Sequence, residues 1–229
     1  MRKYQRVSLL AATVLLASPV SNADGFYFGI SGGVSSIDTV SKSDIDQVVS
    51  EAAQEAADTI GATVEGFDSS LDDTGNVWGL QVGYQWNRYV GAELGYIYLG
   101  KALYEAEFVY TDGIDTVLER DTLRVTSKGF TIAALGFLPI GEHVDLHAKG
   151  GVYFADTRLR MKSSLPDFDE SIQDEMKAST QELFAGIGAA WNINDNYALR
   201  FEYQRFFDVG NSDIGKGDVD VATVSLLFR

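Results

Sequence analysis

The stretch Tyr197-Ala-Leu-Arg-Phe-Glu-Tyr-Gln-Arg205 decides the fold class of this chain. Read with a period of two, one of its faces carries large apolar side chains, those of Tyr197, Leu199, Phe201 and Tyr203. The other face carries small, polar or charged side chains, those of Ala198, Arg200, Glu202 and Gln204. This alternation is typical of a β-strand whose two faces meet different surroundings. Residues 218–228 alternate in the same way up to Phe228, so residues 197–228 are predicted to form the hairpin that closes a membrane barrel.

Six further segments show the periodicity of strands: residues 25–34, 76–86, 89–99, 128–137, 143–157 and 180–192. The connections alternate between short turns and long polar segments, which cover residues 35–75, 99–127, 158–179 and 207–217. Transmembrane barrels show this pattern because their periplasmic turns are short and their extracellular loops are long. Residues 24–229 are therefore predicted to form an all-β, eight-stranded, antiparallel up-and-down transmembrane β-barrel with both termini in the periplasm.

Aromatic residues on the apolar faces are predicted to mark the two membrane interfaces. Trp78 and Trp86 share a face, and about 3.3 Å per residue with a tilt of roughly 40° separates them by about 20 Å along the membrane normal. This is close to the apolar band of about 25 Å in such barrels. The predicted interface residues are Trp78, Trp86, Phe137, Trp191, Tyr197 and Phe228. The segment 128–137 is apolar on both faces, and we expect Leu135 and Phe137 to face outward because Gly136 then faces the narrow interior.

A soluble, lipocalin-like barrel is the alternative, and its apolar face would line an internal cavity. In this chain the polar faces carry many Gly and Ala residues, which a narrow eight-stranded interior needs. The apolar faces carry the bulky aromatics. This difference in size favours the membrane barrel.

Residues 1–23 have the organisation of a secretory signal peptide. Arg2, Lys3 and Arg6 precede a short apolar run, and small residues end at Ala23 before a predicted cleavage at Asp24. Removal of this segment leaves 15 basic residues against 33 acidic ones. The chain has no cysteine, which excludes disulfides, thiolate metal sites and lipidation of an N-terminal cysteine.

Five segments, spread over most of the chain, resemble the transmembrane domain of the OmpA family of bacterial outer membrane proteins. They are Gly25-Phe-Tyr-Phe-Gly-Ile-Ser-Gly-Gly33, Val90-Gly-Ala-Glu-Leu-Gly-Tyr96, Ala134-Leu-Gly-Phe-Leu-Pro-Ile140, Val144-Asp-Leu-His-Ala-Lys-Gly-Gly151 and Leu199-Arg-Phe-Glu-Tyr-Gln204. The resemblance implies an integral outer membrane protein of a Gram-negative bacterium. Full-length members add a periplasmic peptidoglycan-binding domain, which we do not expect here because the sequence ends at Arg229.

The resemblance also implies alternating ionic pairs inside the barrel. Glu93 and Arg200 match two members of that set, whereas Ala134 and Ala190 stand where charged partners are expected. A switchable ionic gate is therefore not expected. Alternation alone places an ionisable cluster inside, consisting of Glu93, Asp145, Lys149, Arg200 and Glu202. We interpret it as a structural network that neutralises itself, with a proton or ion path as the alternative.

Two further groups of residues have side chains of the types that bind metals. His143 and His147 lie about 13 Å apart if both are on one strand, too far to share a metal ion. Asp68, Asp72 and Asp73 could help to bind a divalent cation, although the absence of a calcium-loop pattern favours a solvated surface. We expect no cofactor.

Residues 35–75, 99–127, 155–180 and 207–218 hold 25 of the 33 carboxylates, which argues against nucleic acid as a partner. Within the first of them, apolar residues recur with helical spacing from Ile45 to Ile60, which predicts a helix over residues 44–60 with Ser43 as its N-cap. This helix is expected to pack over the barrel mouth or the neighbouring loops.

The sequence favours a non-enzymatic, monomeric surface or structural protein. Its expected partners are outer membrane lipid and lipopolysaccharide, and a host or envelope protein that contacts the acidic loops. A narrow, low-conductance pore is the first alternative. A lipid-modifying enzyme is the second, and it would need a His/Ser pair on the outward face near the outer rim, where neither histidine is expected.

Overall fold

The computed structural model describes residues 25–37, 42–113, 115–165, 170–211 and 215–229. The predicted signal peptide and its cleavage site lie outside these residues. The elements, in chain order, are β1 (Gly25–Ile37), α1 (Lys42–Ile60), β2 (Thr63–Asp72), β3 (Thr74–Asn87), β4 (Val90–Thr111), β5 (Thr116–Ile140), β6 (Val144–Leu165), β7 (Glu170–Asn192), β8 (Tyr197–Asn211) and β9 (Gly215–Phe228).

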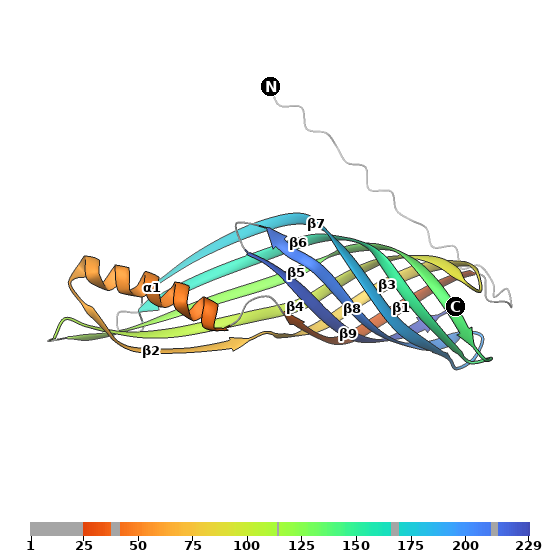
Figure 1. Cartoon of the computed structure of the whole chain (residues 1–229), viewed down its shortest axis with the longest axis horizontal. Helices are drawn as coiled ribbons and strands as arrows, with labels where there is room; N and C mark the ends of the chain where they lie inside the picture. Colours follow the sequence, from red (N-terminus) through yellow and green to blue (C-terminus); the bar gives the residue numbers. More distant parts are fainter. Residues whose placement is uncertain (1–24, 38–41, 114, 166–169, 212–214) are drawn as a thin grey trace, which may run out of the picture.

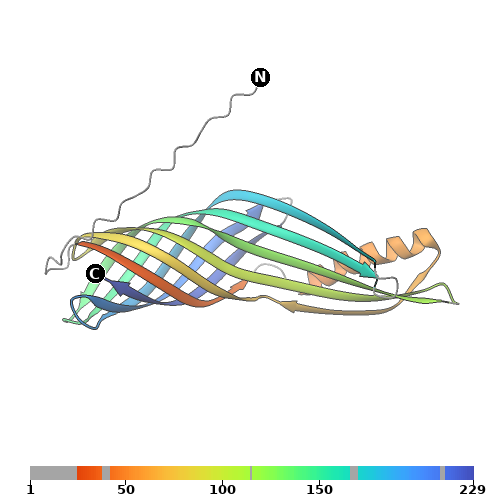
Figure 2. The ribbon, with the colours of Figure 1, turned by 180° about the vertical axis from the view of Figure 1, so that it is seen from behind.

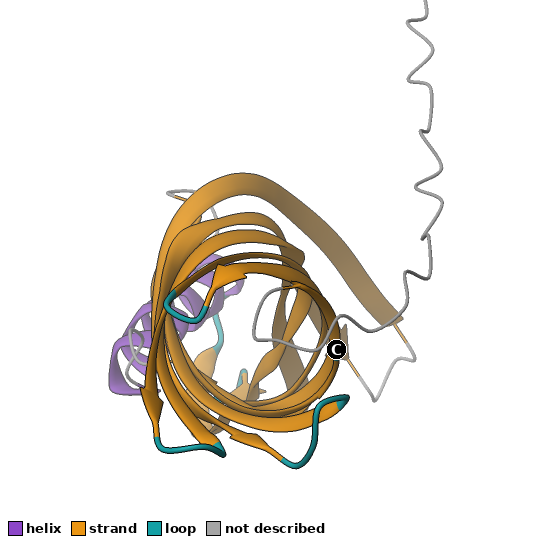
Figure 3. Cartoon of the chain, turned by 90° about the vertical axis from the view of Figure 1, so that its right-hand side faces the viewer, coloured by secondary structure: helices purple, strands orange, loops and turns teal. Residues whose placement is uncertain are grey.

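Eight of these strands close into a ring. Strands β3 to β9 pair with their sequence neighbours, β3 and β9 both pair with β1, and every pairing is antiparallel. The view along the axis shows the closed ring (Figure 3). The predicted eight-stranded up-and-down barrel is thus confirmed. The short turns after β3, β5 and β7 lie at one end with the C-terminus, which we call the turn end, and α1 lies toward the other, the helix end (Figures 1 and 2).

The expected loops at the helix end are largely strand, which corrects the sequence-based assignment. Strands β4 to β7 continue far beyond the ring, and only residues 112–115 separate β4 from β5. We call residues 101–111, 116–128, 156–165 and 170–179 of these strands the extension. The alternation of Tyr104, Ala106 and Phe108 with Glu105 and Glu107 is a strand signal within one of those polar segments.

Strand β2 is a ninth strand outside the ring. Among the described strands it pairs with β4 alone, along the outer half of β4, from Asp72 opposite Leu103 to Thr63 opposite Thr111. The other edge of the extension belongs to β7, whose residues 170–183 pair with β6 alone among the described strands. The extension is therefore an open sheet on top of a closed barrel (Figure 2).

The outer surface of the ring carries a belt of exposed apolar side chains. Its members include Phe26, Phe28, Ile30, Leu80, Val82, Leu94, Phe130, Ile132, Leu183, Ile187, Phe201 and Val224. Such a continuous apolar surface suits lipid rather than water. Trp78, Trp86, Trp191, Tyr197 and Phe228 all point outward within it, with exposures between 36% and 55%.

In strand β5, the side-chain face that points into the barrel is the opposite of the one expected. Leu135 and Phe137 are buried in the barrel, 2% and 8% exposed, while Gly136 faces outward. Phe137 is therefore not an interface residue. Its ring lies 6.1 Å from the ring of His147 inside the barrel. A segment that is apolar on both faces gives no periodicity from which to choose a face, and the Gly136 criterion failed because the interior accepts large side chains at this level.

Helix α1 packs onto the extension. Ala53 and Ala57 are buried against a cluster that contains Tyr104, Ala106 and Phe108 of β4, and Ile45 and Val49 extend the same contact. The predicted helix is confirmed, although it begins at Lys42, so Ser43 lies inside it and is not the N-cap. No helix in the described part of the chain is both long enough and apolar enough to cross a membrane.

Candidate functional site

The interior near the turn end holds an ionic network centred on Glu93 of β4. Nη1 of Arg200, from β8 across the barrel, donates to Oε2 of Glu93 at 2.6 Å. The hydroxyl of Tyr27 donates to the same oxygen at 2.8 Å. Nζ of Lys149 lies 3.3 Å from the other oxygen, Oε1. One carboxylate thereby connects strands β1, β4, β6 and β8.

Glu202 forms the second half of the network. Its Oε1 lies 3.0 Å from Nζ of Lys149 and 3.1 Å from Nε2 of His147. Lys149 therefore bridges the two carboxylates. The side chains of Glu93, Lys149 and Glu202 are no more than 6% exposed.

The charges of this network balance. Two carboxylates face two cations, Lys149 and Arg200, and a neutral His147 can donate from Nε2 to Glu202. The other ring nitrogen of His147 is buried without a partner, which fits a neutral imidazole. Because unpaired buried charges cost several kcal/mol, the balance makes the network structurally stable rather than a store of mobile charge.

The structure brings together four of the five predicted cluster residues. Asp145 lies apart, half-buried toward the turn end, where Nδ2 of Asn192 donates to it at 2.8 Å. The sequence analysis did not include Tyr27 and His147 in this cluster, although both lie on the inward-facing sides of their strands. His143 is exposed in the turn before β6.

Of the two alanines that the family resemblance placed inside the barrel, one lies inside and one lies outside. Ala190 is buried inside the barrel, as expected for an interior position. Ala134 points outward because β5 has the reversed orientation, so it could not have carried an interior partner. Lys149 and Glu202 supply the partner charges instead.

Above the network, apolar side chains fill the barrel. Tyr153 and Phe206 are fully buried and pack edge to face, with their ring centroids 5.1 Å apart. Phe184 stacks on Phe206, with the ring centroids 5.0 Å apart. We call these three residues the aromatic layer. This upper half was not predicted, since we expected the interior to hold polar and small residues only.

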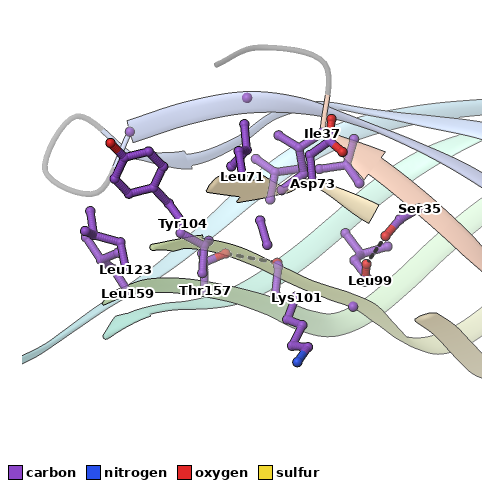
Figure 4. A pocket seen from close by; sticks show the side chains of 18 of the residues that line it. Ser35, Ile37, Leu71, Asp73, Leu99, Lys101, Tyr104, Leu123, Thr157 and Leu159 are labelled. Atoms are coloured by element: carbon purple, nitrogen blue, oxygen red, sulfur yellow. Dashed lines mark hydrogen bonds between the residues drawn. The ribbon is translucent and has the colours of Figure 1, made fainter. Parts of the chain in front are cut away.

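A cavity of 320 Å³ lies among strands at the helix end of the barrel (Figure 4), and Ile45 of α1 is one of its lining residues. Its lining is mostly aliphatic, with Ile37, Leu71, Leu99, Leu123 and Leu159 among the contributors. Beside it, the hydroxyl of Ser127 bonds to those of Tyr153 and Thr157, each at 2.9 Å. Thr157 and Ser127 line the cavity, and the bond from Ser127 to Tyr153 links this lining to the aromatic layer.

A polar clamp fixes α1 on the extension. Asp46 of the helix accepts hydrogen bonds from Nζ of Lys42 at 2.7 Å, from Ser69 of β2 at 2.7 Å and from the hydroxyl of Tyr104 at 2.8 Å. The bond from Lys42 lowers the pKa of Asp46. Burial, with the bond to Asp46, raises the pKa of Tyr104 to about 12.

This clamp predicts a loss of helix docking at both extremes of pH. Tyr104 donates only when neutral, so its contribution is complete below pH 10 and is lost as the pH rises toward 12. Asp46, with its lowered pKa, contributes above its unfolded value of 3.8 and loses that contribution as the pH falls further. Spin labels on Val48→Cys of α1 and Glu105→Cys of β4 should show a broadened distance distribution in both ranges. Tyr104→Phe should abolish the alkaline broadening, and an unchanged alkaline response would contradict the assignment.

The three candidate cation ligands do not converge on one point. The backbone N–H of Ser69 donates to Asp68, and that of Thr74 donates to Asp72, so each of these carboxylates is engaged by the backbone beside it. Among the described residues, no three His, Cys, Asp or Glu side chains are grouped as a metal ion would require. The structure gives no support for a cation site at Asp68, Asp72 and Asp73.

Comparison with known families agrees with this geometry. The family model described as the OmpA-like transmembrane domain matches residues 21–229. The chain belongs to this family. It is accordingly an OmpA-like β-barrel protein of the bacterial outer membrane.

Relatives of this OmpA-like barrel are longer proteins. Outer membrane protein A of Salmonella typhi is 32% identical over 153 residues, which cover 64% of this chain and 38% of the relative. Outer membrane protein A of Shigella flexneri is 30% identical over 135 residues, or 57% of this chain and 33% of the relative. The matched part thus spans between 33% and 38% of the length of these two relatives.

Solved outer membrane barrels are also similar to this chain. Neisserial surface protein A has 9% identity and a TM-score of 0.48, with 90% of this chain and 97% of the neisserial chain covered. Ail of Yersinia pestis, in complex with a heparin analogue, has 15% identity and a TM-score of 0.41, with 89% and 98% covered. At these TM-scores the similarities support no functional inference.

Proposed function

We propose that this OmpA-like barrel is a non-enzymatic surface protein, in which a closed barrel anchors an extracellular sheet and helix that contact partners. The observation that carries the proposal is the filled interior. The ionic network occupies the interior near the turn end, and the aromatic layer with other buried apolar side chains occupies the interior above it. Such an arrangement supports a rigid scaffold better than a pore.

The positions of the histidines favour a non-enzymatic role over lipid modification. The chain has two histidines, and a lipid hydrolase of the kind considered would need one beside a serine on the outward face at the helix end. His147 is enclosed in the barrel, and His143 is at the turn end. Lipid A from cells with and without the protein should have the same mass spectrum, and a protein-dependent shift would instead identify an enzyme.

The partner surface that we propose is the exposed side of α1 together with the extension. Val48 is 67% exposed on the helix, and acidic side chains surround it, including Glu51 and Glu55. A host or envelope protein with basic and apolar residues would complement this surface. With the helix end extracellular, the helix would be displayed well above the membrane.

Planar-bilayer recordings test the closed scaffold directly. Purified monomer should show no conductance or only small events, on the order of tens to hundreds of picosiemens, because an eight-stranded interior is just wide enough for side chains to fill. A matched variant, Tyr153→Ala with Phe206→Ala, removes most of the aromatic layer and should increase the conductance. Stable nanosiemens steps from the unmodified monomer would overturn the scaffold in favour of a pore.

A further inference from the structure

Basic side chains are concentrated on the outward face of the extension, although the chain as a whole is acidic. Six of the 15 basic residues beyond the signal segment gather on β5, β6 and β7, namely Arg124, Lys128, Arg158, Arg160, Lys162 and Lys177. We call these six the basic patch. Their neighbours Val125 and Leu159 line the cavity on the inner face, so strand alternation turns the patch outward.

The strand register sets like charges directly against each other. Arg124 lies opposite Arg160 across β5 and β6, and Arg158 lies opposite Lys177 across β6 and β7. Directly opposed like charges destabilise a sheet. In a chain with a formal net charge of −15, carboxylates are abundant, yet they do not occupy these four places.

Two acidic residues within the patch neutralise only part of it. Glu175 pairs with Arg160 at 2.7 Å and with Lys177 at 2.8 Å, and Asp156 lies 3.8 Å from Arg158. The bonds from Lys177 and Arg160 lower the pKa of Glu175 to about 2, so it is already ionised. Six cations against two anions leave an excess of about four positive charges, and Nε of Arg158 is buried without a hydrogen-bond partner.

The patch begins where the lipid-facing belt ends. Phe130 lies opposite Phe154 at the edge of the belt, and Lys128 and Arg158 follow two and four residues further along their strands. At about 3.3 Å per residue, the patch covers the first 7 to 26 Å beyond the belt, measured along the strands. It faces sideways, parallel to the membrane surface, and not outward from the cell.

We infer that the basic patch binds the phosphate groups of lipopolysaccharide in the surrounding outer leaflet. This rests on the proposed orientation, in which the helix end is extracellular. Lipopolysaccharide carries its phosphates on the sugars immediately above its acyl chains, at the height where the patch begins. Guanidinium groups suit phosphate because they offer paired donors in a plane. A phosphate between opposed cations would also relieve their repulsion, which explains why repulsive pairs occur here.

The test compares two variants that lose the same number of charges. Arg124→Gln with Arg158→Gln removes one member of each opposed pair, and neither arginine holds a close ion pair. Arg88→Gln with Lys216→Gln removes two exposed cations elsewhere, at the turn end and at the mouth. Folding of each variant is checked by heat-modifiable migration. Binding of fluorescent lipopolysaccharide to protein in detergent is then measured in EDTA, over a range of salt concentrations.

The patch variant should bind lipopolysaccharide about tenfold more weakly and with a smaller salt dependence, while the control variant should change less than about twofold. Without lipopolysaccharide, the patch variant should melt at a higher temperature than the unmodified protein, because the repulsion is reduced. Equal loss in both variants, or undiminished binding of dephosphorylated lipopolysaccharide, would overturn the inference. Binding of heparin but not of lipopolysaccharide would point to a soluble sulfated glycan and would also overturn it. Conductance of the same preparation tests the scaffold separately, so either proposal can fail alone.

Discussion

Arg200→Ala should destabilise the folded barrel by about 3–5 kcal/mol, because removing one partner of a buried ion pair leaves the other unpaired. Arg200 is 1% exposed and provides the shortest contact to Glu93, at 2.6 Å. Without it, Glu93 and Glu202 face only Lys149, and the network carries a net negative charge in a space closed to water. Urea unfolding in detergent, followed by tryptophan fluorescence and heat-modifiable migration, measures the loss.

The matched control is the double variant Glu93→Gln with Arg200→Gln. It removes one charge of each sign and leaves Lys149 paired with Glu202 at 3.0 Å. It should therefore cost less free energy of unfolding than Arg200→Ala alone, although it replaces two residues. If the double variant is the less stable of the two, the network is held by packing and not by charge balance.

Leu94→Arg should cost about 2–4 kcal/mol in a lipid bilayer, the penalty for a basic residue at the middle of the lipid-facing surface. Leu94 is 59% exposed on the outside of β4, between Val82 and Ile132 on the adjacent strands, both about half exposed. The expected loss comes from placing a guanidinium in hydrocarbon, since more than half of Leu94 is exposed on the outer surface. Unfolding in phospholipid vesicles measures it.

Glu105→Arg is the control, because Glu105 lies on the same strand, faces outward and stands beyond the belt. It should change the stability by less than about 0.5 kcal/mol, as expected for an exposed position. Equal tolerance of arginine at both positions would mean that the belt is not in contact with lipid.

The closing hairpin shows how far sequence alone reaches. Large residues from Tyr197 to Tyr203 alternate with small or charged ones, and only one orientation buries Arg200 and Glu202 with partners. Where the two faces differ in this way, period-two patterning specifies both the strand and its inward side. The same rule identified the exposed tryptophans.

The reversed orientation of β5 shows where that rule ends. Its outward and inward residues are equally apolar, with Phe130 and Ile132 against Leu135 and Phe137, so patterning holds no information about the face. Only the register with β4 and β6 decides it, and that register depends on contacts distant in sequence. His147 and Tyr27 were missed for a related reason, since their role depends on carboxylates carried by other strands.

The sequence analysis did not predict the extension, because the high density of charged residues in these segments suggested loops. Strand pairing satisfies the backbone whatever the side chains are, and charged residues are stable on a strand face that meets water. The alternation in residues 103–110 contained the signal, and composition concealed it.

The free edge of β7 has a consequence for association between copies of this chain. Residues 170–183 expose unpaired backbone groups along one side, among the described strands, and such a margin can recruit a strand from a neighbouring molecule. Charged side chains recur along it, those of Glu170, Asp174, Glu175, Lys177 and Glu182. If a second copy paired along this edge in the same orientation, like charges of the two β7 strands would lie together. Electrostatic repulsion therefore disfavours pairing between two copies. The edge of the extension can therefore remain unpaired without promoting strand exchange between copies of the chain.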